Sequence, residues 1–249
     1  PQFAHLPMIL GEDKKRLSKR QGAMGVQEFR DKGFLNSALV NYLALLGWNP
    51  GTEQELFSPE ELTRKFSIDR VHKKGAVWDN QKLEWINQQT ILRMQNDDIL
   101  VQILNIDSQW GEKQQEETLL SVIELMKPRS KTFVEFIETT DYFFNDPKEY
   151  DPKTIRKRWK NFDVNELVNE YIQCLETVED WAVENVEVEL RNLSDRKNIS
   201  PAKLIHPVRL ALSGIGVGPS LFHMMKVLGK DICVRRLKKA VDSLPVEKH

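Results

Sequence analysis

Residues 36–47, Asn-Ser-Ala-Leu-Val-Asn-Tyr-Leu-Ala-Leu-Leu-Gly, begin with two residues that can cap a helix and end with a glycine that can stop one. The apolar residues between them recur at the three- and four-residue spacing of one helix face: Leu39, Tyr42, Leu43 and Leu46. The stretch therefore predicts an α-helix with one buried side, capped by Asn36 or Ser37.

The same kind of signal recurs along the chain after residue 25. Helix starts are expected at Ser58-Pro59, Asp79, Thr132 with Glu135, Asp163 with Glu166, Ser200-Pro201, Pro219 and Asp231, and helix stops at Gly214 and Gly229. Alternating strand patterns are nearly absent, apart from a short apolar run over residues 6–10, so the sequence predicts a mainly α fold. The polar stretches 96–98 and 107–115 are expected to be surface connections.

Composition excludes several classes of protein. The 249 residues are 40% hydrophobic and 29% charged, which is typical of a globular chain of about two domains. Cys174 and Cys233 stand far apart, so neither a disulfide framework nor a metal site is expected. We expect a reducing, cytoplasmic location. No apolar run has the length of a membrane span. The net charge of −1 means that any nucleic-acid binding must come from local patches.

A cationic loop occupies residues 11–22, Gly-Glu-Asp-Lys-Lys-Arg-Leu-Ser-Lys-Arg-Gln-Gly. Five of the seven residues from Lys14 to Arg20 are basic, and a glycine stands at each end. Lysine is a point charge on a flexible stem, and the Ser18 hydroxyl can donate beside it, so the loop is suited to holding polyphosphate. Composition alone leaves open an ordinary solvated basic loop.

Two further basic clusters lie in the second half of the chain. The residues expected to contact a nucleic-acid backbone are Arg156, Arg158, Lys160, Arg235 and Arg236. A solvated helix face is the alternative for both clusters, and the pattern of charges by itself does not decide between them.

The order Arg16-Leu17-Ser18-Lys19-Arg20 resembles the Lys-Met-Ser-Lys-Ser loop of class I aminoacyl-tRNA synthetases, in the form typical of the glutamyl branch. Further segments resemble bacterial-type glutamyl-tRNA synthetases in the same order: 33–48, 77–87, 124–129, 142–144, 207–214, 218–222 and 228–230. The glutaminyl enzymes share a similar loop but have β-barrel anticodon domains, which the helical second half of this chain excludes.

The resemblance implies a domain plan. Residues 1–95 would be the end of the catalytic domain with its loop, followed by a helical stem-contact domain. Residues 96–146 and 147–249 would be two α-helical anticodon-binding domains, with the turn-rich segment 146–152 between them. The chain begins without Met inside a predicted strand, so it is expected to be a fragment without the nucleotide-binding half.

The resemblance also implies roles for individual residues. Lys19 would contact ATP and stabilise the pyrophosphate as negative charge develops, with Ser18 and Arg16 beside it. Arg129 aligns with an arginine that reads the last anticodon base, although a helix cap or a salt bridge is its alternative role. The remaining anticodon-binding residues would be Gly218, Pro219, Ser220 and Leu221.

Two positions depart from the family pattern. The family usually has Lys where this chain has Arg16, a change that keeps the positive charge. It usually has Thr or Ser where this chain has Gly218, a change that removes a hydroxyl and leaves only main-chain contacts there.

The implied parent enzyme attaches L-glutamate to tRNA(Glu) using ATP with Mg²⁺. Glutamate and ATP would bind through the missing half, so the chain alone is expected to bind tRNA weakly, to hold no cofactor and to catalyse nothing. It is expected to be a monomer. The alternative from another class is a non-catalytic helical RNA-binding module descended from a synthetase, which an intact cationic loop argues against.

Overall fold

The computed structural model describes residues 7–17, 25–159 and 162–244. Within these residues, thirteen α-helices and a few short 3₁₀ helices account for most of the chain, beside two strands of two residues each. The expected mainly α fold is thereby confirmed. Ser18, Lys19 and Lys160, three of the predicted site residues, lie outside the described residues.

The chain forms two compact units. Unit 1 consists of Pro1–Glu112 and Met126–Glu138, and unit 2 consists of Lys113–Leu125 and Thr139–His249. The finer division into a stem-contact domain and two anticodon-binding domains stays a prediction.

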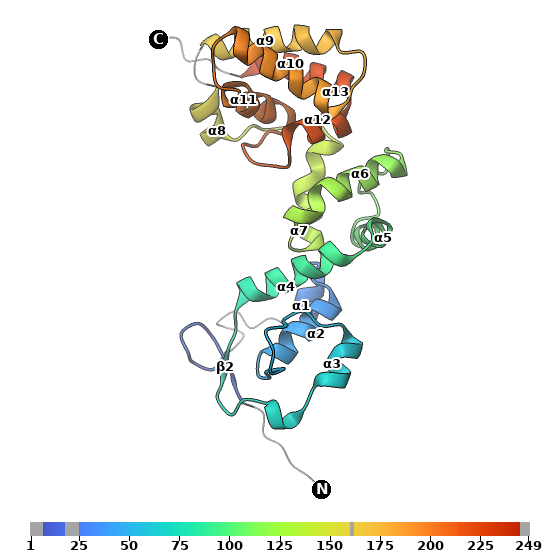
Figure 1. Cartoon of the computed structure of the whole chain (residues 1–249), viewed down its shortest axis with the longest axis vertical. Coiled ribbons are helices and arrows are strands. Elements are labelled where there is room, and N and C mark those ends of the chain that lie inside the picture. Colours follow the sequence, from blue (N-terminus) through green and yellow to red (C-terminus); the bar gives the residue numbers. More distant parts are fainter. Residues whose placement is uncertain (1–6, 18–24, 160–161, 245–249) are drawn as a thin grey trace. The chain divides into compact units, whose positions relative to one another are not determined.

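Unit 1 combines a small parallel sheet with a helical body (Figure 1). Strand β1 (Ile9–Leu10) pairs with β2 (Ala76–Val77), with Ile9 opposite Ala76. The helices are α1 (Val26–Asp31), α2 (Asn36–Leu45), α3 (Pro59–Lys65), α4 (Asn80–Arg93), α5 (Asn96–Ile106) and most of α7 (Phe133–Thr140), with 3₁₀ helices η2 (Ile68–Arg70) and η3 (Lys127–Arg129).

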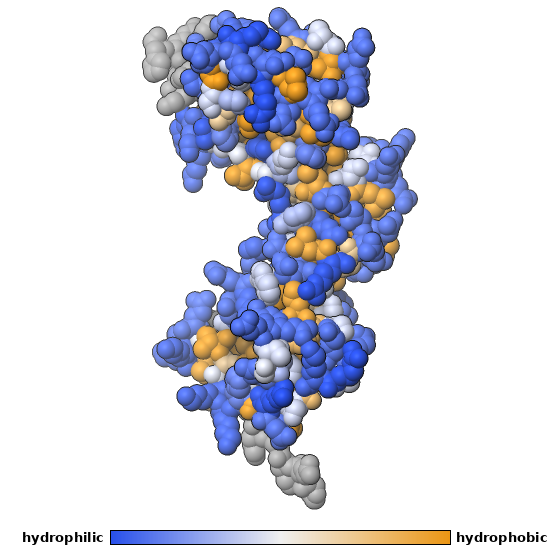
Figure 2. Space-filling view, in the orientation of Figure 1, coloured by the Kyte–Doolittle hydropathy of each residue, from blue (hydrophilic) through white to orange (hydrophobic). Residues whose placement is uncertain are grey.

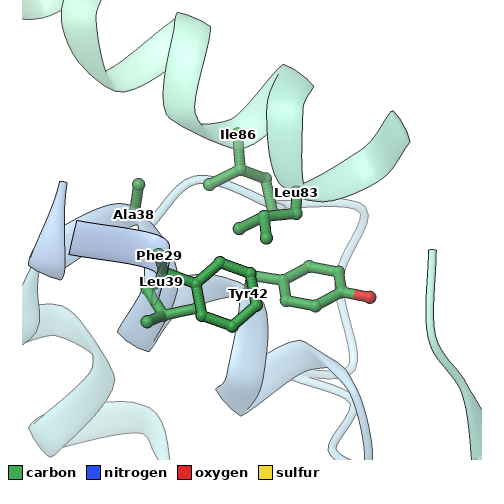
Figure 3. Packing of buried hydrophobic residues seen from close by; sticks show 6 residues of the cluster. All are labelled: Phe29, Ala38, Leu39, Tyr42, Leu83 and Ile86. Atoms are coloured by element: carbon green, nitrogen blue, oxygen red, sulfur yellow. The ribbon is translucent and has the colours of Figure 1, made fainter. Parts of the chain in front are cut away.

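One core cluster of unit 1 is formed by α1, α2 and α4 (Figure 3). Its buried side chains are Phe29, Ala38, Leu39, Tyr42, Leu83 and Ile86. The Tyr42 hydroxyl accepts the N–H of Asp79 at 2.7 Å, and the Asp79 carboxylate in turn accepts the N–H of Lys82 at 3.0 Å. The cap of α4 is therefore tied directly to the core that α4 helps to form.

Several helix boundaries follow the sequence signals. Ser58 and Glu61 form the expected capping box, and Asp79 caps α4 as predicted. The predicted cap at Asn36 or Ser37 is wrong, because α2 begins at Asn36 and Leu35 is its N-cap. The cause is tertiary: the N–H of Leu35 donates to the Asn87 side chain at 2.9 Å.

Two other expectations are corrected. Residues 96–98 are the first turn of α5 rather than a connection, and Asp97 and Asp98 face the positive end of that helix. Asp163 does not cap its helix, because α9 already begins at Phe162 and places Asp163 inside the first turn.

Every regular element in the described part of unit 2 is a helix (Figure 1). Its elements are α6 (Glu116–Met126, except the last residue), η4 (Asp141–Phe143), α8 (Pro152–Arg158), α9 (Phe162–Thr177), α10 (Val183–Arg196), α11 (Ala202–Ser213), α12 (Leu221–Leu228) and α13 (Lys230–Ser243). Helices α9, α11 and α13 pack against one another. Each contributes a fully buried residue, such as Tyr171, Val208 and Leu237.

Hydrophilic residues cover most of the visible surface, with smaller hydrophobic areas between them (Figure 2). The two cysteines are free thiols, and Cys233 is buried. Burial raises the pKa of the Cys233 thiol to about 12, so it stays protonated and behaves as a small apolar residue.

Replacing the same side chain at a buried and an exposed position of unit 1 tests this core. Ile86 is fully buried, whereas Ile68 is 60% exposed. Ile86→Ala should lower the free energy of unfolding by about 2–5 kcal/mol through lost burial and a cavity. Ile68→Ala should change it by only about 0.5 kcal/mol. Urea unfolding of both variants checks this, and equal losses would contradict the core assignment.

Candidate nucleic-acid interface

The described part of the cationic loop is a tight turn attached to β1. The N–H of Gly11 donates to the carbonyl of Lys15 at 2.9 Å, and the N–H of Leu17 donates to that of Ile9 at 3.0 Å. Arg16 is exposed and forms a β-bridge with Leu10. Backbone hydrogen bonds therefore fix the start of the loop next to β1, and the Arg16 side chain lies in solvent. The roles predicted for Ser18 and Lys19 stay predictions.

Arg129 lies at the end of η3, on a turn that α4 holds from one side. Lys127 donates through Nζ to the carbonyl of Met94 at 2.5 Å, and Gln88 donates through Nε2 to the carbonyl of Pro128 at 2.9 Å. These contacts attach the backbone on the N-terminal side of Arg129 to the C-terminal half of α4.

Asn87 holds the other side of the turn. Its side chain is fully buried, donates through Nδ2 to the carbonyl of Lys131 at 2.5 Å, and accepts the N–H of Leu35. Arg129 itself is exposed, and the described residues give it no ion pair. A cation presented from a turn held on both sides is suited to a directional contact with a base.

The segment after α11 is shaped by close backbone approach. Gly214 ends α11 at φ 76° and donates its N–H to the carbonyl of Leu210 at 2.8 Å. A Cβ at Gly214 would lie 2.6 Å from the carbonyl oxygen of Glu149, and a Cβ at Gly216 would overlap the hydroxyl of Thr154. Glycine is therefore required at both positions, because the chain turns directly against residues 149–154.

The structure separates the predicted residues of this segment. Gly218 is half-exposed and Ser220 exposed, whereas Pro219 and Leu221 are buried. The Leu221 side chain is only 3% exposed and packs into unit 2, so it is not available for the predicted anticodon contact, and a contact through its main chain stays a prediction. The Pro219 side chain is equally unavailable. Two apolar side chains that the sequence did not single out are exposed instead, Ile215 at 38% and Val217 at 77%.

Arg209 is a further candidate for the nucleic-acid interface, and it was not singled out from the sequence. Its Nη1 lies 2.9 Å from the position that a Cβ at Gly218 would occupy. The space of a Thr or Ser side chain is therefore taken by the guanidinium of a half-exposed arginine. The signal was present in Pro207-Val208-Arg209, but a basic residue inside a helical pattern is ordinarily a solvated one.

The basic cluster of α8 faces α11. Arg156 is exposed and Arg158 half-buried. The pKa of His206 on α11 is lowered, first by burial and then by the positive charges of Arg158, Arg209 and Lys157. Arg158, Arg209 and Lys157 therefore lie close enough to His206 to raise the local positive potential around α11, which favours phosphate binding.

The two arginines of α13 have different environments. Arg235 is exposed and pairs with Asp146, whereas the side chain of Arg236 is only 2% exposed. The backbone contact predicted for Arg236 is therefore wrong, because its guanidinium is enclosed by protein. Successive side chains on a helix point about 100° apart, so a run of basic residues reaches the buried side as well as the surface.

Asp146 joins both of these arginines. Burial opposes its ionisation, but hydrogen bonds from Arg235 and Arg236 outweigh that effect and hold the pKa of Asp146 below its ordinary value. The carboxylate is therefore charged at neutral pH and neutralises part of the positive charge of α13.

The described residues contain no group of three His, Cys, Asp or Glu side chains that could hold a metal ion. No helix among the described residues is both long and apolar enough to cross a bilayer.

Two family models match the chain in succession. The catalytic domain of class I tRNA synthetases (E and Q) matches residues 1–85, and the anticodon binding domain matches residues 83–241. The second match covers more than half of the chain and includes Arg129, α8 and the loop after α11. These features define a class I aminoacyl-tRNA synthetase with an α-helical anticodon-binding region.

The relatives specify the branch. The chain is 43% identical to the glutamate–tRNA ligase of Prosthecochloris aestuarii over 99% of its length, and 41% identical to that of Chloroherpeton thalassium over 98%. A crystal structure of a glutamate tRNA ligase from Elizabethkingia meningosepticum, in complex with its amino acid, superposes with a TM-score of 0.86 at 29% identity, over 98% of this chain and 52% of that one.

The chain belongs to the glutamyl-tRNA synthetase family, as its resemblance predicted. It spans about half the length of the curated relatives it matches, 51% in both cases above.

The pairing of Asp146 predicts a dependence of stability on pH. An aspartate has a pKa of about 3.9 in an unfolded chain, and the folded value here is lower. The charged form therefore stabilises the fold above the unfolded pKa, and this contribution is lost as the pH falls through the folded pKa. The difference in free energy of unfolding between wild type and Asp146→Asn should be constant above about pH 5 and shrink below about pH 4.

Urea unfolding at a series of pH values measures this difference. Asp195→Asn removes the same charge from an exposed site on α10 and corrects for the change in net charge. A difference that stays constant down to pH 3 would show that Asp146 is not paired in the folded protein.

Proposed function

We propose that this chain is the tRNA-binding part of a glutamate–tRNA ligase, the enzyme that attaches L-glutamate to tRNA(Glu) with ATP. The observation that carries the proposal is the pair of family matches in chain order, catalytic domain and then anticodon-binding domain, within relatives that are glutamate–tRNA ligases.

Each surface has a role in this proposal. The cationic loop supplies Lys19 to the phosphates of ATP, which is accompanied by Mg²⁺, with Ser18 and Arg16 beside it. Arg129 contacts the last anticodon base, and the loop after α11 contacts the anticodon through Gly218 and Ser220. Arg156, Arg158, Lys160 and Arg235 contact tRNA phosphates. The enzyme acts as a monomer in the cytoplasm.

The electrostatics of unit 2 support the tRNA contacts. Cations of α8 and α11 lie near His206, and the loop after α11 carries the exposed apolar side chains of Ile215 and Val217. RNA loops present both phosphates and unstacked bases to such groups. Because the net charge is −1, attraction to RNA depends on these local groups and should weaken with salt. A non-catalytic RNA-binding module would use the same surfaces but has no need of Lys19.

A substitution in the cationic loop distinguishes the ligase from the binding module. Lys19→Ala in a full-length protein that contains this chain should slow glutamate-dependent ATP–pyrophosphate exchange by about one to three powers of ten, because a preorganised charge is lost from the transition state. Lys74→Ala, an exposed lysine of unit 1, is the matched control and should leave exchange unchanged. The 249-residue chain alone should show no exchange. Near-normal exchange in the Lys19 variant would remove the catalytic assignment.

Arg129→Gln tests base reading from the η3 turn. Glutamate and glutamine anticodons differ at the last base, cytosine against guanine, and an arginine can donate to the cytosine carbonyl. A well-placed base contact is worth roughly 1–3 kcal/mol. The variant should therefore narrow the preference for tRNA(Glu) over a transcript with guanine at that base by about tenfold.

The matched control is Arg191→Gln, which removes an exposed arginine that pairs with Glu187 on α10. Competitive binding of the two transcripts provides the measurement. An unchanged ratio in the Arg129 variant would make that residue structural.

A further inference from the structure

Arg236 is a buried cation with four acceptors around it. Its Nη1 donates to the carbonyls of Tyr142 and Leu212, both at 2.7 Å, its Nη2 donates to the carbonyl of Asn145 at 2.9 Å, and its Nε donates to Asp146 at 3.0 Å. A buried charge is tolerated only when it is paired and hydrogen-bonded in this way. The guanidinium therefore links α13 to two other segments of unit 2.

The first linked segment leads into the protein loop of residues 214–220, which is proposed to contact the anticodon. Leu212 is the next-to-last residue of α11, where backbone carbonyls have no partner inside the helix. Arg236 satisfies this carbonyl and places a positive charge at the negative end of α11. Only Ser213 and Gly214 separate Leu212 from residues 215–218, of which Ile215 and Val217 are exposed, so the point where the loop leaves α11 is held directly.

The second linked segment supports the other side of the same loop. Asp146 is followed by residues 147–154, which contact the 214–220 loop. The N–H of Asp151 donates to the carbonyl of Gly214 at 2.8 Å, and Thr154 lies directly against Gly216. Arg236 therefore holds both the stem of the loop and the start of the segment on which the loop rests.

We propose that Arg236, held by Asp146, is a positioning residue for anticodon reading: it makes no contact with RNA but sets the place of the 214–220 loop. The inference rests on the proposed function, because it assumes that this loop contacts the anticodon. It assigns to Arg236 a role in specificity in place of the phosphate contact expected from the charge run.

An arginine is required for this role. The planar guanidinium carries five N–H donors in a fixed fork and can bridge carbonyls on two segments at once, whereas an ammonium group is a point charge that cannot span them all. Arg236→Lys keeps the charge and should release one of the two segments. Asp146→Asn is the milder variant, because the carbonyl contacts of Arg236 can remain.

Gly214→Ala displaces the same loop by an independent route. It forces a side chain into a left-handed backbone conformation and toward the carbonyl of Glu149. Gly229→Ala is its matched control, since φ is also positive there, at 81°, but nothing lies within 4 Å of the added Cβ. Both changes strain the backbone, and only the first should move the loop.

The experiment uses the full-length protein that contains this chain and three kinds of RNA. These are a tRNA(Glu) transcript, the same transcript with each anticodon base replaced in turn, and a hairpin of the acceptor stem without an anticodon. The discrimination ratio is the affinity for tRNA(Glu) divided by that for the most affected anticodon variant. Thermal unfolding is recorded for every variant.

Arg236→Lys and Gly214→Ala should each lower the discrimination ratio by about tenfold or more, and Asp146→Asn should lower it less. Affinity for the acceptor-stem hairpin should stay at the wild-type value. The unfolding temperature of each variant should also lie well above the temperature of the binding assay, which excludes unfolding of unit 2 as the cause of the lower ratio. Gly229→Ala and Arg191→Lys, the latter an exposed arginine of the same unit, should leave the ratio unchanged.

Two results overturn the inference in different ways. If Gly214→Ala lowers the ratio while Arg236→Lys and Asp146→Asn lower only the unfolding temperature, Arg236 is structural and the proposed function stands. If the wild-type protein does not discriminate between anticodons at all, the proposed function fails and the inference fails with it.

Discussion

A charged guanidinium can be enclosed in protein only if its donors find acceptors, and unit 2 is organised around that requirement at Arg236. Its acceptors come from η4, from the turn that follows and from the end of α11. Removing one partner of such a group leaves a desolvated charge, which costs far more than the loss of a surface ion pair. The geometry of the Gly214 loop therefore depends on a polar contact in the interior as well as on the loop's own glycines.

Unit 1 uses a neutral group for a similar purpose. Asn87 is fully buried on α4 and satisfies backbone groups of Leu35 and Lys131, which are far apart in sequence. It sets the start of α2 and one side of the turn that presents Arg129. In both units a buried polar side chain satisfies backbone groups of segments that are far apart in sequence, and an exposed candidate residue lies close by in the chain.

The helix ends that were predicted correctly are those set by local chemistry. Ser58, Asp79 and Gly214 were assigned correctly because a cap or a left-handed stop depends on a few neighbouring residues. The start of α2 was displaced by a tertiary contact. The burial of the Leu221 and Arg236 side chains was not foreseen, because a motif and a charge run do not state which side of a helix faces the protein interior.

The sequence by itself determined the mainly α class, several helix ends and the family, since periodicity, capping and ordered motifs are carried by residues close together in the chain. Only the tertiary structure decided which predicted site residues reach solvent. Arg156 and Arg235 do, whereas Arg236 does not, and Arg209 takes the space beside Gly218. Exposure depends on which segments pack together over long sequence distances, and that information is not contained in any single stretch of the chain.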